Sequence, residues 1–123
     1  TPSAPPVWLA GAEATMKRAI ERRLPYQASR ATPSELAGTA QQFFDAGGLL
    51  LAHRVRILTG QEESPGNQVD WNAVTGSVAE IVDSLGQFSA MGVSDLSIVP
   101  GLDSSSSRRT IEILVSEVLP QLV

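Results

Sequence analysis

Four short apolar segments alternate with amphipathic segments along the chain, and this alternation is what most restricts the fold. The apolar segments, residues 7–10, 24–28, 50–57 and 96–99, have the length of strands and are bounded by glycine, proline or polar residues. Each precedes a stretch whose apolar residues recur at helical spacing. This order predicts an α/β fold with a parallel sheet and right-handed crossovers. Four such (βα) units make either half of a barrel or a small open sheet.

Two of the predicted helices have clear start signals. Thr32 and Glu35 have the spacing of a capping box, and Pro33 occupies the first helical position, where its missing donor costs nothing. Ser77 and Glu80 repeat the capping box before the third helix. The helices that follow are predicted to end at the glycines of residues 47–48 and 92.

The last helix is predicted to bury a single apolar stripe and to end at Pro120. The stripe consists of Ile111, Leu114, Val115, Val118, Leu119 and Leu122.

Composition excludes several classes of protein. At 123 residues the chain, 1–123, is at most one domain. A net charge of −4, spread along the sequence, argues against nucleic-acid binding. The chain has no cysteine and a single histidine, so disulfides and metal centres held by thiolates or histidines are not expected. No apolar run approaches the roughly 20 residues of a membrane span and no signal peptide opens the chain, so a cytoplasmic protein with no membrane partner is expected.

The third predicted strand has two different sides at its far end. Val55 and Ile57 alternate with Arg54 and Arg56, which predicts that one side faces solvent or a ligand. His53 lies in the same strand with no acidic or cysteine partner nearby in the sequence, and we interpret it as a packed or surface residue rather than a catalyst.

Several segments resemble the luciferase-like monooxygenase superfamily, which includes bacterial luciferase and the flavin- or deazaflavin (F420)-dependent oxidoreductases. Residues 6–12 (PVWLAGA) resemble a strand of that family and the turn after it, and residues 24–33 (LPYQASRATP) resemble its next strand and loop. Residues 74–77 (VTGS) and the closing segment, with GVSDLSIVP before a helix containing EVLPQL, are similar to later motifs. Their order implies the C-terminal half of a TIM-type (β/α)8 barrel.

The resemblance also implies a function. It is that of an oxidoreductase or monooxygenase, a flavoprotein or deazaflavoprotein in which FMN or F420 acts on a small-molecule substrate, with F420 slightly preferred. The half that carries most of the family's flavin-stacking and substrate contacts is absent. The sequence RRL at residues 22–24 also replaces the family's usual turn. The resemblance therefore implies part of a longer enzyme, inactive by itself, and it identifies no catalytic acid or base.

Gly11, Ser29 and Arg30 are the predicted cofactor contacts. Gly11 ends a strand and opens a helix, where backbone amides can approach a phosphate, and the family's cofactor-binding backbone lies at the matching position. The alternative is a tight turn that simply requires glycine. Ser29 and Arg30 lie in the next loop, which the family uses for the cofactor's phosphate or tail. The alternative for Arg30 is a solvated loop charge.

A second phosphate candidate lies before the last helix. The serines of residues 104–107 and the following Arg108 and Arg109 lie where barrels often bind phosphate. The alternative is a serine-capped helix with solvated arginines.

A different class of function also fits the sequence. A non-catalytic half-barrel, with no cofactor, would expose two unpaired strand edges and an inner face. A twofold homodimer could cover them. The expected partner is therefore either a second copy of the chain or a missing N-terminal half.

Overall fold

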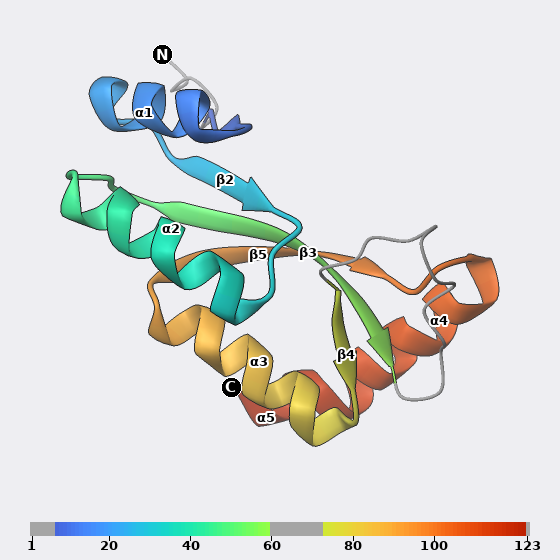
Figure 1. The fold of residues 1–123 in the computed structure, drawn as a ribbon. Helices are drawn as coiled ribbons and strands as arrows, with labels where there is room; N and C mark the ends of the chain where they lie inside the picture. Colours follow the sequence, from blue (N-terminus) through green and yellow to red (C-terminus); the bar gives the residue numbers. More distant parts are fainter. Residues whose placement is uncertain (1–6, 60–72, 123) are drawn as a thin grey trace, which may run out of the picture.

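A computed structural model describes residues 7–59 and 73–122 of the chain (Figure 1). The strands and helices follow one another in the order β1 (Leu9–Ala10), α1 (Glu13–Arg22), β2 (Tyr26–Ser29), α2 (Pro33–Asp45), β3 (Leu51–Thr59), β4 (Val74–Gly76), α3 (Val78–Ala90), β5 (Val93–Pro100), α4 (Ser104–Ile113), the π-helical turn η2 (Leu114–Val118) and α5 (Leu119–Leu122). The fold is α/β with alternating strands and helices, as the sequence predicted.

All strand pairs are parallel, and β3 lies at the centre of the sheet. β1 pairs with β2, β2 pairs with the first half of β3, and β4 pairs with the last three residues of β3. β5 pairs with β3 from residue 51 to residue 57, on the other edge. The parallel pairing of the first two strands confirms the prediction of a crossover helix between them.

The sequence missed one strand and misplaced the ends of others. β4 was not predicted, because three residues are too few for periodicity to reveal. The first strand is shorter than residues 7–10, and the second begins after Pro25, which has no N–H to donate to a neighbouring strand. The last strand is longer than predicted and begins directly after Gly92.

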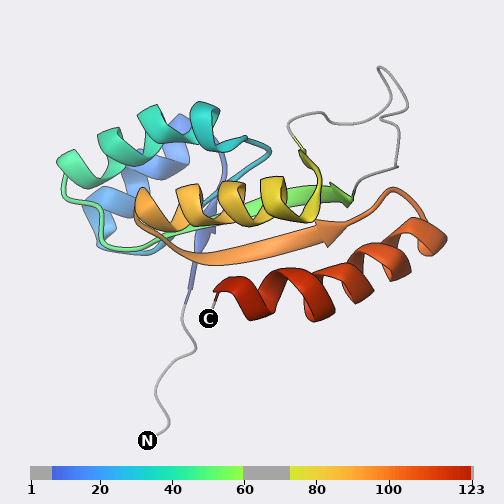
Figure 2. The ribbon, with the colours of Figure 1, turned by 90° about the horizontal axis from the view of Figure 1, so that it is seen from below.

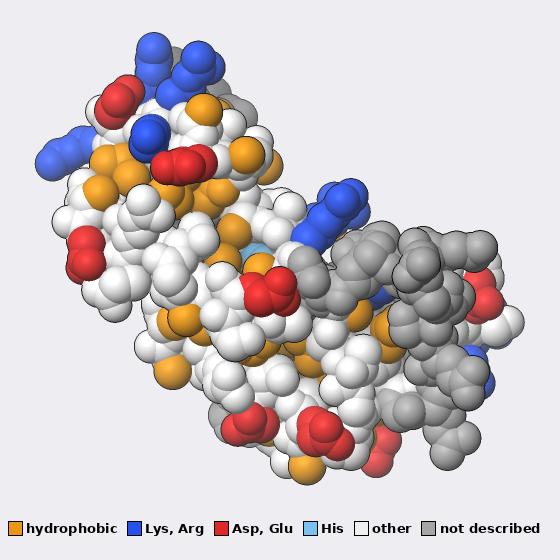
Figure 3. Space-filling model, in the orientation of Figure 1, with side chains coloured by type: hydrophobic (Ala, Val, Ile, Leu, Met, Phe, Trp, Pro, Cys, Tyr) orange, Lys and Arg blue, Asp and Glu red, His pale blue; other side chains and the backbone are white. Residues whose placement is uncertain are grey.

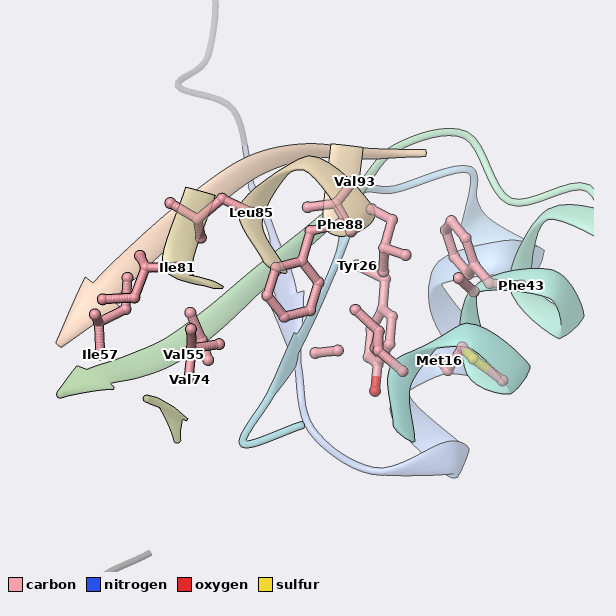
Figure 4. Close-up of a cluster of buried hydrophobic side chains, with 14 of the residues drawn as sticks. Met16, Tyr26, Phe43, Val55, Ile57, Val74, Ile81, Leu85, Phe88 and Val93 are labelled. Atoms are coloured by element: carbon pink, nitrogen blue, oxygen red, sulfur yellow. The ribbon is translucent and has the colours of Figure 1, made fainter. Parts of the chain in front are cut away.

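One face of the sheet is covered by helices. Tyr26 of β2 contacts Phe43 of α2, with ring centroids 5.8 Å apart, and His53 of β3 contacts Phe88 of α3 at 4.9 Å. Thr59 at the end of β3 lies 3.3 Å, oxygen to oxygen, from Thr110 of α4. The apolar core lies on this helix-covered face, as Figure 4 shows for its central side chains. Side chains that alternate with these along each strand point to the opposite face, which we call the open face.

The last helix continues past Pro120, contrary to the prediction. It runs alongside β5 from Ser104 to Leu122 without a break (Figure 2). The Leu119 amide bonds to the carbonyl of Leu114, five residues earlier, which widens the turn. Proline would otherwise clash with the carbonyl four residues before it, so a wider turn lets the helix continue through Pro120.

The predicted stripe of this helix divides into two faces. Leu114 and Val118 are buried in the core. The other four members are exposed to between 41% and 60%, and they form a second apolar row: Ile111, Val115, Leu119 and Leu122. The sequence identified the apolar residues correctly but placed too many of them in the core.

Candidate functional site

The turn between β1 and α1 requires the glycine at position 11. Gly11 has a φ of 154°, and a Cβ added there would lie 2.5 Å from the Thr15 hydroxyl oxygen. Its carbonyl accepts a hydrogen bond from the Tyr26 hydroxyl, whose pKa is raised because the ring is buried. The tight-turn interpretation of Gly11 is therefore correct. A role in ligand binding is compatible with it, since the same turn brings backbone close to any ligand.

The N-terminus of α1 differs from those of the other long helices. At the start of α2, the carboxylate of Glu35 accepts a hydrogen bond from the Thr32 amide. At the start of α3, Ser77 and Glu80 form the predicted capping box. At α1 the corresponding residue is Ala12, whose side chain cannot accept a hydrogen bond. Among the hydrogen bonds of the described residues, none gives the amides of Glu13 and Ala14 an acceptor. Free amides and the helix dipole favour an anion at this point.

A groove of about 430 Å³ lies beside this helix end and reaches the carboxyl ends of β1 and β2. Gly11 and Ser29, two of the three predicted contacts, both line it, together with Ala12, Glu13, Met16, Tyr26, Ala28, Ala31, Leu36, Thr39 and Gln42. The structure therefore brings together two residues that are 18 positions apart. Glu13 places a carboxylate at the rim, but that carboxylate lies 3.6 Å from the ammonium of Lys17.

Arg30 follows Ser29 directly but is not among the residues that line the groove. It has a left-handed backbone, with a φ of 61°, and its amide donates to the carbonyl of Arg54 over 3.0 Å. A non-glycine residue in this conformation is strained by about 1–2 kcal/mol. Its side chain is exposed at the end of β2. Figure 3 shows one face of the molecule, on which the Lys and Arg side chains gather mainly over α1.

The serines of residues 104–107 form the first turn of the last helix, and Asp103 is its N-cap. Asp103 accepts from the Ser106 amide at 2.9 Å, and the Ser106 hydroxyl accepts from the Asp103 amide at 3.0 Å. The hydrogen bonds from Ser106 are the main reason that the pKa of Asp103 lies below its usual value. Ser107 donates to the Pro100 carbonyl at 2.6 Å. The carboxylate of Asp103 already occupies this helix end and would repel a phosphate. The structure therefore favours the capping interpretation over a phosphate site.

His53 is fully buried and packed, which agrees with the interpretation from sequence. Its Nε2 lies 2.8 Å from the carbonyl of Ala31, and its ring contacts Phe88. Burial lowers its pKa, and the hydrogen bond to Ala31 opposes that effect in part.

Within residues 7–59 and 73–122, no three His, Cys, Asp or Glu side chains are grouped to hold a metal ion. None of the described helices has the length and apolar character needed to cross a membrane.

Comparison with known proteins supports the fold. The chain resembles the crystal structure of apo-MsnO8 with a TM-score of 0.66 and 16% sequence identity, over 93% of this chain and 51% of that one. At this identity the likeness shows the fold alone, and the chain spans about half the length of its structural relative. No protein-family model matches the sequence, and no curated protein matches it either.

Proposed function

We propose that this chain is the C-terminal half-barrel of a luciferase-like oxidoreductase or monooxygenase, and that it holds the phosphate end of FMN or F420. The observation that carries the proposal is the groove that joins Gly11 and Ser29 beside the uncapped end of α1. In barrels of parallel strands, ligands bind at the carboxyl ends of the strands, which is where this groove lies.

The residues present fit a phosphate group. The amides of Glu13 and Ala14 would donate to its oxygens, and the hydroxyl of Ser29 would add a third donor. Arg30, the next residue, would supply a positive charge from outside the groove. When bound, the flavin or deazaflavin ring supplies the redox chemistry on a small-molecule substrate. This half of the protein grips the cofactor and leaves the ring to the missing half.

Two features support an incomplete barrel. Among the described strands, β1 pairs only with β2 and β5 pairs only with β3, so both ends of the sheet lack a neighbour. The last helix, which carries the exposed row from Ile111 to Leu122, runs alongside β5, the strand at one of these ends (Figure 2). A further set of (βα) units would cover both the edges and the row, and the structural relative is about twice as long.

Titration of FMN and F420 into the chain tests the proposal. We expect weak, saturable binding, because only the phosphate end has a site here. Arg30→Ala should weaken it about tenfold, the usual effect of losing a hydrogen bond from a charged group. Arg22→Ala removes an exposed arginine from the last turn of α1, at the end away from the groove, and should leave binding unchanged.

Binding that is tight and indifferent to Arg30→Ala would reject the site. Full turnover by the chain alone would reject the half-barrel. An encoding reading frame that continues upstream of Thr1 for a similar length would support it.

A non-catalytic half-barrel that self-associates is the second candidate. The four exposed aliphatic side chains of the last helix favour it, since a second copy could pack against them. This candidate expects a dimer by sedimentation that Val115→Ser dissociates, and no effect of either cofactor. A chain that stays monomeric at high concentration would contradict it.

A further inference from the structure

Three polar side chains form a row across the open face of the sheet. Arg54 of β3 is the register partner of Ser29 on β2 and of Ser97 on β5. Neighbouring strands lie about 4.8 Å apart, so the three residues are side by side. All three are exposed. We call this set, Ser29, Arg54 and Ser97, the open-face row.

An arginine in this position is unusual for a central strand. Strands in the middle of a parallel sheet normally carry apolar side chains on both faces. On the helix-covered face, Val55 follows this rule, and His53 is buried there as well. Arg54 thus introduces a charge at the middle of the open face.

The two arginines of β3 are used differently. Arg56 donates to the carbonyl of Gly101, which ties β3 to the loop after β5. No hydrogen bond or ion pair joins the Arg54 guanidinium to another residue in the described part of the chain. Arg56 therefore has a structural partner, whereas Arg54 presents its five donors to whatever approaches the open face.

The local charge favours an anion, although the chain as a whole carries −4. Asp95 is the nearest acidic residue on this face in the strand register, one row earlier on β5, where it partners Ala52. The carboxylate of Asp95 accepts a hydrogen bond of 2.8 Å from the Ser94 hydroxyl, and it forms no ion pair with Arg54. Arg30 follows Ser29 at the end of β2, and its backbone amide bonds to the Arg54 carbonyl, so a second positively charged residue lies next to the row in the sequence.

We propose that the open-face row binds an oxyanion, the carboxylate or phosphate group of a small molecule. The guanidinium of Arg54 would hold two oxygens at once, and the hydroxyls of Ser29 and Ser97 would donate to the oxygens on either side. Ser29 also lines the groove beside α1, but Arg54 and Ser97 lie outside it, so this site goes beyond the proposed cofactor grip. In a completed barrel the row would face the interior, where a bound small molecule is enclosed.

The test is a titration of the chain with inorganic phosphate in one arm and acetate in the other, followed by NMR of the arginine side-chain N–H groups. We expect the Arg54 signal to shift and saturate, and the tighter arm identifies the class of oxyanion. Arg54→Gln should weaken binding at least tenfold, and Arg54→Lys should retain part of it because the charge remains. Ser97→Ala should weaken it about threefold. Arg22→Gln, which removes an exposed arginine from the last turn of α1, is the matched control and should have no effect.

Several outcomes would overturn the proposal. One is binding that survives Arg54→Gln in a variant whose thermal unfolding matches the wild type. Another is binding lost equally in Arg22→Gln, which would show only general charge attraction. A third is binding lost in Arg30→Gln but not in Arg54→Gln, which would locate the anion at the cofactor groove and leave the proposed function standing. A change in self-association without anion binding would identify the row as a protein interface instead.

Discussion

The two faces of β3 differ in kind, although they alternate residue by residue along one strand. The helix-covered side is buried at every position: Leu51, His53, Val55, Ile57 and Thr59. On the open side, Ala52 and Leu58 are buried, but Arg54 between them is exposed and Arg56 is half-buried. Burial of apolar surface on the first face stabilises the fold. The second face contributes less to stability and keeps its charges available, so stability and binding are separated by a single step along the strand.

The largest expected effect comes from the helix-covered face. Ile81 of α3 is fully buried there, so Ile81→Ala should lower the free energy of unfolding by about 2–5 kcal/mol. Ile111 of α4 is 48% exposed and provides a matched control. Ile111→Ala should cost less than about 1 kcal/mol. Urea unfolding of both variants measures the difference, and equal losses would mean that the last helix is rotated from its position here.

The second expected effect concerns the titratable group on that face. Burial lowers the pKa of His53, so the unfolded chain binds a proton more readily than the folded chain does. Stability should therefore be complete above the ordinary histidine pKa of about 6.5 and should fall as the pH drops from there toward the lower folded pKa. One proton sets the limit of this slope at about 1.4 kcal/mol per pH unit.

Urea unfolding between pH 7.5 and 5 tests this expectation. His53→Gln should flatten the dependence on pH in that window, even if it lowers stability overall. A wild-type chain that gains stability on acidification over the same range would show that His53 is charged when folded.

The helix-covered face was largely predictable from sequence, and the reason is local. The capping boxes of Thr32 with Glu35 and of Ser77 with Glu80 depend on residues three positions apart, so the sequence contains the whole signal. The parallel order of strands follows from the connecting helices. By contrast, Val115 and Leu119 were predicted to be buried, and they are exposed. Periodicity shows that a residue is apolar but not whether a neighbouring element exists to cover it.

The candidate site was predictable only in part. Gly11 and Ser29 meet at one groove because consecutive parallel strands end at the same edge, which the order of strands implies. The alternation around Arg54 indicated a solvent- or ligand-facing side. Its pairing with Ser97 depends on the register of β3 with β5, and that register includes an irregularity near the start of the pair. No local pattern specifies such a register, since it is set by packing between distant segments.

The smallest effect lies at the end of β2, where the two faces meet. Arg30 has a left-handed backbone that costs a non-glycine residue about 1–2 kcal/mol, and glycine adopts it freely. Arg30→Gly should therefore be more stable than Arg30→Ala by about 1 kcal/mol, although both remove the same guanidinium. Comparing two variants that lack the side chain cancels any contact that Arg30 itself makes. Urea midpoints measure the difference, and an alanine variant at least as stable as the glycine variant would contradict the left-handed backbone. Should glycine prove the better residue for folding while both variants lose cofactor binding, the strain at position 30 is retained for what its side chain binds.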